Sequence, residues 1–365
     1  MTDPTAGPAA DLLAATAVLV DVASPSRSEG PIVDIVEARL RAAEHLEVTR
    51  VGDNVVARTA LGRPWRLVLA GHTDTVPADG NETARLEGDR LHGLGAADMK
   101  GGLAVMLDLA LTVTEPAVDC TYVFYAREEV AAAESGLGEL FEVRPDLLVG
   151  DAAVLGEPTD GALEAGCQGT MRLRVTLVGA RAHTARPWMG RNAIHRLGGL
   201  LNELDAYQER RPVIDGCQFR EALQAVSVDG GVAGNVVPDR VALVINHRFA
   251  PDRTPVEAEA HVRSVLGGWL EEGDQVEVVE VVAGAAPAHT HPLISTLVAR
   301  NHLEVRAKLG WTDVARFAAR GVPAANLGPG DSTLAHTPDE HLDRGPLEAV
   351  WAALHDLVTR GPDPS

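Results

Sequence analysis

The chain has 365 residues, of which 45% are hydrophobic and 23% charged, so it is long enough for two or three compact domains and too apolar to be disordered. Its 52 acidic residues against 32 basic residues give a formal net charge of −20, which argues against nucleic acid or an anionic membrane as the main partner. Three widely spaced cysteines and the lack of a signal peptide or a long apolar run favour a cytoplasmic protein without disulfides.

The first part of the chain alternates helical and strand patterns. Two helices are predicted near residues 9–22 and 28–43. Apolar runs at residues 65–70 and 122–126 predict buried strands, and the pattern of residues 103–111 predicts a helix between them. We therefore expect an α/β fold in which helices flank a mixed sheet.

From residue 171 onward apolar and polar residues alternate, which is typical of a half-exposed strand. The elements predicted after this strand are a helix, two strands, a helix and a strand, near residues 194–204, 222–230, 240–249, 255–267 and 275–282. This β-α-β-β-α-β order predicts a ferredoxin-like α+β domain, inserted as residues 171–284. A last helix near residues 347–358 is expected to return to the first domain, which comprises residues 1–170 and 285–365.

Residues that can bind metal follow the predicted strands. His72 and Asp74 come directly after the first apolar strand, so the histidine is a candidate ligand and the aspartate its orienting partner. A loop histidine without a function explains this motif equally well. Asp98 lies in a glycine-rich turn before the next helix. Its charge and the absence of a Gly-Lys-Ser/Thr sequence disfavour phosphate binding there and favour a divalent cation.

Three further groups extend this set. Glu128 and Glu129 follow the strand at residues 122–126, so one can bind a metal while its neighbour handles a proton, although a solvated helix N-terminus is the alternative. Glu157 follows another apolar run, and His336 lies in a loop near the end of the chain. Each signal is weak by itself, but together they supply nitrogen and oxygen donors without sulfur. Such donors suit a hydrolytic pair of zinc ions.

These motifs resemble those of the co-catalytic zinc family of desuccinylases, acetylornithine deacetylases, aminoacylases and glutamate-releasing carboxypeptidases. The resemblance covers nearly the whole chain and rests on Gly71–Pro77, Gly95–Gly102, Glu128–Glu129, Gly156–Pro158 and His336. It implies a zinc-peptidase-like catalytic domain with two Zn²⁺ per subunit, for which Co²⁺ can substitute. It also implies that the inserted domain is a lid through which two copies form a homodimer.

The same resemblance implies a role for each residue of the first domain. Five residues are implied metal ligands, with His72 and Glu157 on one ion, Glu129 and His336 on the other, and Asp98 bridging both. Glu128 is the implied general base, and Asp74 is the residue that holds the His72 imidazole.

Residues of the inserted domain and of its flanks are candidates for contacts with substrate. His183 lies in a segment that resembles the one whose histidine reaches a neighbouring active site and polarises the scissile carbonyl; an exposed loop histidine is the alternative. Asn235, Arg248, Thr312 and Arg186 are the candidate substrate-binding residues. Arg248 suits a carboxylate, although a surface salt bridge would also explain it.

Within the family the resemblance is strongest to desuccinylases of the actinobacterial type, so we expect hydrolysis of a small N-succinyl amino acid. One departure is that Cys167-Gln168 stand where other desuccinylases carry a basic pair, for which Arg186 or Arg316 is a candidate replacement. Deacetylation of acetylornithine and carboxypeptidase action are the alternatives within the family. A non-catalytic metal-binding homologue and a nucleotide-binding module are the alternatives of other classes.

Overall fold

The computed structural model describes residue 8 and residues 11–363. Over this range the chain forms two compact units. The first unit comprises Met1–Ala165, Pro287–Arg306 and Arg316–Ser365, and the second comprises Gly166–Ala286 and Ala307–Ala315. No helix within the described range combines the length and the apolar character needed to cross a membrane.

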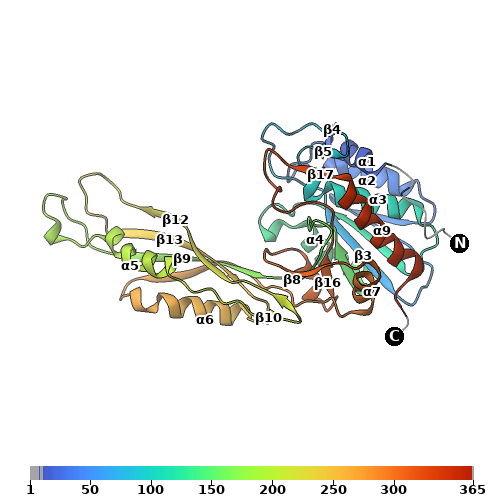
Figure 1. Ribbon diagram of the computed structural model, residues 1–365. Coiled ribbons are helices and arrows are strands. Elements are labelled where there is room, and N and C mark those ends of the chain that lie inside the picture. Colours follow the sequence, from blue (N-terminus) through green and yellow to red (C-terminus); the bar gives the residue numbers. More distant parts are fainter. Residues whose placement is uncertain (1–7, 9–10, 364–365) are drawn as a thin grey trace. The chain divides into compact units, whose positions relative to one another are not determined.

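The first unit contains an eight-stranded mixed sheet (Figure 1). In spatial order its strands are β1 (Glu47–Val51), β2 (Asn54–Arg58), β6 (Asp119–Tyr125), β3 (Arg66–His72), β7 (Ala152–Leu155), β16 (Ala324–Asn326), β8 (Leu163–Cys167) and β15 (Val305–Lys308). Strand β3 pairs in parallel with both β6 and β7. The carboxyl ends of these three neighbouring strands therefore meet at one edge of the sheet.

Helices cover this sheet and bury its central strands. The helices of the first unit and its boundary are α1 (Leu12–Val20), α2 (Gly30–Arg41), α3 (Gly101–Thr112), α4 (Gly136–Val143), α7 (Pro292–Asn301), α8 (Val314–Ala318) and α9 (Arg344–Arg360). Helices α1, α2 and α9 pack against α3, and α3 lies on β3 and β6. Every residue of β6 is buried, and its second half is the apolar run that predicts the strand. A small sheet of β17 (His341–Asp343), β5 (Arg90–His92) and β4 (Arg85–Glu87) completes this unit.

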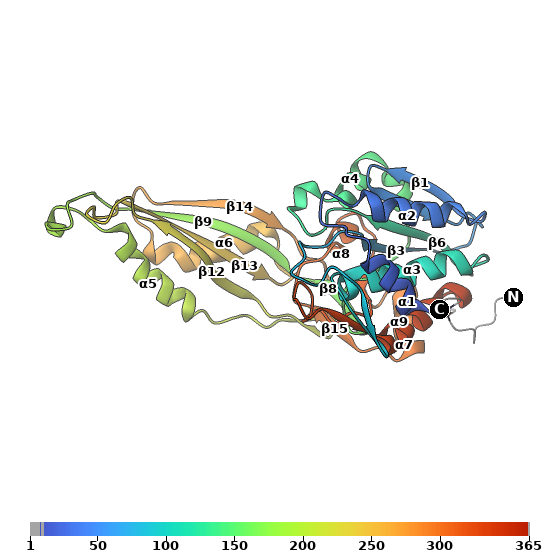
Figure 2. The same cartoon turned by 90° about the horizontal axis from the view of Figure 1, so that it is seen from above.

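The second unit is a four-stranded antiparallel sheet with two helices (Figure 2). In spatial order its strands are β12 (Ala222–Gly230), β13 (Arg240–Phe249), β9 (Gly169–Val178) and β14 (Gln275–Val282). The helices are α5 (Ala193–Asp205) and α6 (Pro255–Leu266), and a short hairpin is formed by β10 (Val213–Ile214) and β11 (Cys217–Gln218). This strand order is that of the ferredoxin-like plan.

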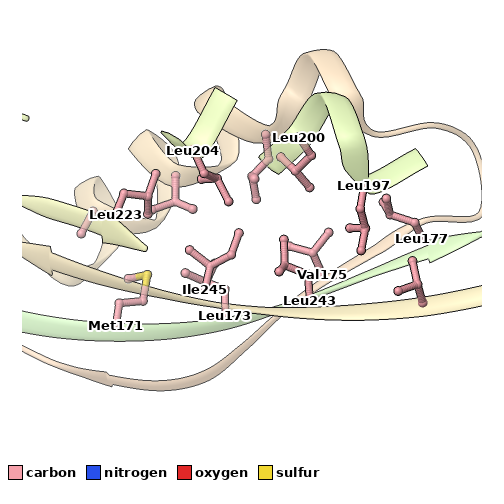
Figure 3. Close-up of a cluster of buried hydrophobic side chains, with 14 of the residues drawn as sticks. Met171, Leu173, Val175, Leu177, Leu197, Leu200, Leu204, Leu223, Leu243 and Ile245 are labelled. Atoms are coloured by element: carbon pink, nitrogen blue, oxygen red, sulfur yellow. The ribbon is translucent and has the colours of Figure 1, made fainter. Parts of the chain in front are cut away.

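The alternating sequence of the second unit explains its core. Along β9 and β13 every second residue is buried, and these residues face α5 and α6. Figure 3 shows Leu197, Leu200 and Leu204 of α5 directed toward the sheet, on which Leu243 and Ile245 are labelled. Since each buried leucine removes apolar surface from water, this contact holds the helices on one face and leaves the other face open.

Local sequence signals fix several helix starts. The Thr254 hydroxyl accepts a hydrogen bond from the Glu257 amide and the Glu257 carboxylate accepts one from the Thr254 amide, so α6 begins with a capping box. Asp11 caps α1 in a similar way through the amides of Leu13 and Ala14. The predicted start of this helix near residue 9 lies outside the described residues. The predicted α/β fold with a mixed sheet flanked by helices is confirmed, as is the ferredoxin-like order of the inserted elements.

Candidate metal centre

The candidate site lies where β3, β6 and β7 end. His72 is the last residue of β3, Glu128 and Glu129 follow β6, and Glu157 follows β7. Asp98 lies in the distorted turn that leads into α3, and the Asp98–Met99 peptide bond is cis. The parallel register of the strands thus places residues that are far apart in sequence at the same edge of the sheet.

The donor atoms of these residues form two groups that share one aspartate. The first group is His72, Asp98 and Glu157, and the second is Asp98, Glu129 and His336. Within each group the ligand atoms all lie within 4.8 Å of one another. A third group is formed by Glu128 with His72 and Glu129, whose donor atoms also lie within 4.8 Å of one another. The structure therefore brings together all five predicted ligands and the predicted base, with Asp98 positioned to serve both groups.

His72 has only one nitrogen available as a metal ligand. Its Nδ1 lies 3.0 Å from the backbone carbonyl oxygen of Asp74, which can only accept a hydrogen bond, so Nδ1 carries the proton. Its Nε2 faces Oδ1 of Asp98 at 3.1 Å. Burial by itself lowers the pKa of His72, but the carboxylates of Asp74 and Asp98 outweigh burial and raise it well above the usual value.

Asp74 has a wider role in the structure than orienting one imidazole. Its Oδ1 accepts a hydrogen bond from the Glu128 amide and its Oδ2 one from the Glu129 amide, both at 3.0 Å. The hydroxyl of Ser26 donates to the same Oδ2 at 2.7 Å. Burial alone would raise the pKa of Asp74, yet these contacts and His72 hold it well below the usual value. A negatively charged Asp74 thus ties the end of β3 to the loop after β6.

Sequence reasoning missed Glu340, which holds the turn that carries Asp98. Glu340 is 1% exposed, and its Oε1 accepts hydrogen bonds from the amides of Ala97 and Asp98, both at 3.0 Å. Burial raises its pKa. Glu340 follows His336 by four residues, so its position beside a candidate ligand is the only sequence signal that could have identified it.

Glycines allow the segments around Glu157 to approach closely. A Cβ atom at Gly102, in the first turn of α3, would collide with the carbonyl oxygen of Gly156. A Cβ atom at Gly328 would collide with the same oxygen and with the carbonyl oxygen of Glu157. These positions require glycine, since the start of α3 and the loop before His336 must both contact the strand end that carries Glu157.

The chemistry of this donor set fits divalent metal ions. The side chains of Asp98 and Glu129 are 12% and 10% exposed, and Glu157 is 5% exposed. Carboxylates this close to one another and this far from water repel each other unless a cation lies between them. Oxygen and imidazole nitrogen donors without thiolate suit zinc, and also cobalt or manganese. The site can therefore bind metal and place an acid, Glu128, next to it.

The remaining candidates belong to the second unit. His183 pairs with Val236 across a β-bridge, and its Nδ1 accepts a hydrogen bond from the Ala185 amide at 3.1 Å. Asn235 lies beside it, since its carbonyl oxygen accepts a hydrogen bond from the Thr184 amide. Arg186 is exposed in the same loop. The roles of these residues stay predictions.

Arg248 and Thr312 lie elsewhere in this unit. Arg248 is on β13, on the sheet face opposite the helices. Burial and the nearby guanidinium of Arg172 lower its pKa. Thr312 is buried, and its carbonyl oxygen accepts a weak hydrogen bond from the Cys167 thiol at 3.7 Å. Their contacts with substrate also stay predictions.

Known proteins are similar in sequence to this chain over most of its length. The sequence profile of Peptidase family M20/M25/M40 matches residues 68–360. A Mycobacterium tuberculosis protein provisionally named succinyl-diaminopimelate desuccinylase DapE is 52% identical over 351 residues, which cover 96% of this chain and 97% of that protein. The succinyl-diaminopimelate desuccinylase of Corynebacterium glutamicum is 43% identical and covers 96% of both chains.

Solved structures show the same fold at low sequence identity. A tripeptidase from Staphylococcus aureus gives a TM-score of 0.78 at 21% identity and covers 95% of this chain and 97% of its own. An M20 family metallo-carboxypeptidase from Sulfolobus solfataricus gives a TM-score of 0.72 at 14% identity, with 95% and 98% covered. The Bacillus subtilis YXEP protein, described as a dinuclear metal binding peptidase of the M20 family, gives 0.68 at 16% identity, with 95% and 96% covered.

Glu340 provides a test of the metal centre that does not remove a ligand. Replacing it with alanine (Glu340→Ala) leaves the amides of Ala97 and Asp98 without their acceptor, so we expect Asp98 to lose its position. Metal affinity, measured by calorimetric titration of the metal-free protein with Zn²⁺, should fall about 10- to 100-fold. Glu115→Ala, at an exposed position, is the control and should bind metal as the wild type does. Equal affinities in the two variants would contradict this role.

Proposed function

The chain belongs to peptidase family M20/M25/M40, a family of amide-bond hydrolases, and we propose that it is a succinyl-diaminopimelate desuccinylase. In this reaction N-succinyl-LL-2,6-diaminopimelate and water give succinate and LL-2,6-diaminopimelate, which serves lysine and diaminopimelate biosynthesis in the cytoplasm. The pair of donor groups that share Asp98, with Glu128 beside them, is the observation that supports amide hydrolysis. The choice of this substrate is supported by the identity to the two relatives named desuccinylase. The expected family membership is confirmed by the profile match and by the two relatives.

We assign the metal ligands from the two donor groups. His72 and Glu157 would hold one Zn²⁺, Glu129 and His336 would hold the second, and Asp98 would contact both. Cobalt can replace zinc in such a set of donors. When bound, the ions supply Lewis acidity, which lowers the pKa of water and polarises the amide carbonyl.

Glu128 is the residue proposed to move the proton. Its carboxylate takes a proton from the attacking water and delivers it to the amine nitrogen as the carbon–nitrogen bond of the amide breaks. The Glu128 amide donates to Asp74, and this bond fixes the backbone from which the carboxylate extends. His183 is proposed to donate a hydrogen bond to the carbonyl oxygen as negative charge develops on it.

Recognition of the substrate's anionic groups is assigned to residues of the second unit. Arg248 forms no ion pair within the described part of the chain, and its guanidinium is half-buried, which suits it to a substrate carboxylate. Asn235, Thr312 and Arg186 are proposed to bind the other polar groups. An overall charge of −20 repels an anionic substrate, so local cations must compensate for it.

The homodimer is proposed to form through the edge of the second unit's sheet. Strand β12 lies at this edge, and its residues from Gln224 to Gly230 are all exposed. Val226 and Val228 are 56% and 52% exposed. An edge with unpaired backbone groups and apolar side chains favours pairing with an identical strand of a second copy, and two-fold symmetry would close such a contact.

Substrate identity is tested with three compounds offered side by side to the zinc-loaded protein: N-succinyl-LL-2,6-diaminopimelate, N-acetylornithine and a dipeptide that ends in glutamate. We expect the highest kcat/KM for the first, and loss of turnover when the metal is removed with a chelator. A higher kcat/KM for the second or third compound would show that the protein is a deacetylase or a carboxypeptidase instead. A zinc-loaded protein inert toward all three would favour a non-catalytic homologue.

Glu128→Gln separates proton transfer from metal binding. Glutamine has nearly the same shape but cannot accept the proton, so kcat should fall by at least about 100-fold while zinc content stays that of the wild type. Metal analysis of the purified variant and steady-state kinetics provide the two measurements. Turnover above about one per cent of wild type with full zinc content would rule out Glu128 as the base.

The dimer is tested by placing a charge on the edge strand. Val228→Lys introduces an ammonium group where the second strand would pair, so sedimentation velocity at micromolar concentration should show the variant as a monomer and the wild type as a dimer. Val256→Lys, at a 77% exposed position on α6, is the matched control and should remain dimeric. A wild-type protein that sediments as a monomer would exclude the homodimer.

A further inference from the structure

The segment Ser24–Glu29, which connects α1 to α2, runs beside the end of β3. The amide of Thr75 donates to the Ser24 carbonyl oxygen at 2.9 Å, and the amide of Ser26 donates to the Thr75 carbonyl oxygen at 3.1 Å. This segment therefore follows the chain that carries His72 and Asp74, although nearly fifty residues separate the two in sequence. The functional assignments above use none of its residues.

Two buried carboxylates, those of Glu29 and Asp74, accept hydrogen bonds from three successive backbone amides next to this segment. Oε1 of Glu29 accepts a hydrogen bond from the Arg127 amide at 3.1 Å and another from the Arg27 amide at 3.0 Å. The Asp74 carboxylate accepts hydrogen bonds from the next two amides, those of Glu128 and Glu129. Ser26 supports this arrangement, because its hydroxyl donates to Asp74. The backbone on both sides of Glu128 is thus held by side-chain acceptors.

The backbone at Arg127 has a strained conformation that its surroundings must stabilise. Arg127 has a φ of +61°, a left-handed conformation that residues with a Cβ seldom adopt. Its side chain is also tied down, since Nε donates to the Glu134 carbonyl oxygen at 2.8 Å and an Nη atom donates to Glu139 at 2.6 Å. A strained residue directly before the proposed base persists only where its surroundings hold it.

Stabilisation of helix α2 does not account for Glu29. It is the residue before the helix, but its carboxylate makes no hydrogen bond to the amides of the first turn. The side chain is fully buried, and its Oε2 has no hydrogen-bond partner among the described residues. A buried carboxylate with an unused oxygen is costly, so a role in stability alone explains it poorly.

We propose that Glu29 and Ser26 are positioning residues for the general base: together with Asp74 they hold the backbone of Arg127–Glu129 so that the Glu128 carboxylate stays aimed at the metal centre. This inference rests on the proposed role of Glu128. It adds to the reaction two residues from a segment that contributes neither a metal ligand nor a proton-transfer group.

The test compares Glu29→Ala and Ser26→Ala with Glu29→Gln and Ser28→Ala. Glutamine keeps an oxygen that can accept both amides, and Ser28 is an exposed serine of the same segment, so these two variants are the conservative rescue and the matched control. We expect Glu29→Ala to lower kcat about 10- to 100-fold and Ser26→Ala about 3- to 10-fold, with KM and zinc content close to wild type. Glu29→Gln and Ser28→Ala should stay within about threefold of wild-type kcat.

Hydrogen–deuterium exchange gives a readout that does not depend on turnover. Loss of the Glu29 acceptor should make the amides of residues 127–129 exchange at least about tenfold faster, while the amides of α9 exchange as in the wild type. Faster exchange in Glu29→Ala would show that Glu29 holds this backbone whether or not the wild type hydrolyses an acyl amino acid, so failure of the inference and failure of the proposed function can be told apart.

Three results would overturn the inference itself. One is wild-type exchange at residues 127–129 in Glu29→Ala. Another is an equal loss of kcat in Glu29→Gln and Glu29→Ala, and the third is an equal effect of Ser26→Ala and Ser28→Ala. If Glu29→Ala does not fold, Ser26→Ala against Ser28→Ala decides the question by the same two readouts, kcat and exchange.

Discussion

A concentration of negative charge at the ends of three parallel strands is the constraint on which the rest of the site depends. Asp98, Glu129 and Glu157 are mostly shielded from water and lie within a few ångströms of two imidazoles. Carboxylates in such surroundings repel each other, so the protein must hold them by other contacts until a cation neutralises them. The supporting groups show how this is done.

The supporting carboxylates accept their backbone hydrogen bonds in pairs, and none of them accepts a hydrogen bond from a lysine or arginine side chain in the described part of the chain. Asp74, Glu340 and Glu29 each accept two backbone N–H groups in the described part of the chain. An amide donor stabilises a carboxylate without adding a full positive charge. The centre therefore keeps its net negative charge, which a pair of divalent ions can balance. A guanidinium at any of these positions would weaken metal binding by the same electrostatic argument.

The sequence could predict where the strands end, but not which buried side chains hold the loops between them. His72, Glu128 and Glu157 follow continuous apolar runs, and parallel strands align their carboxyl ends, so their meeting at one edge follows from pattern and topology. Glu29 lies just before a helix, where an acidic residue already has a local explanation in the helix dipole. Its actual partner, the Arg127 amide, is 98 residues away and depends on the tertiary fold. Glu340 could not be predicted for the same reason, because the amides that donate to its carboxylate lie more than 240 residues earlier in the chain.

The departure at Cys167-Gln168 can be understood from burial. Cys167 is fully buried, and burial raises the pKa of its thiol to about 11, so it stays neutral. Gln168 is 1% exposed, and its side-chain amide donates to the Arg220 carbonyl oxygen at 2.7 Å. Both side chains are thus committed to buried contacts and cannot replace a cation. In the proposed reaction the metal site would act only on the amide to be cleaved, so the proposed selection of the acyl amino acid depends on other residues. Arg248 remains our first candidate for this contact, because it combines partial burial with the absence of an ion pair among the described residues.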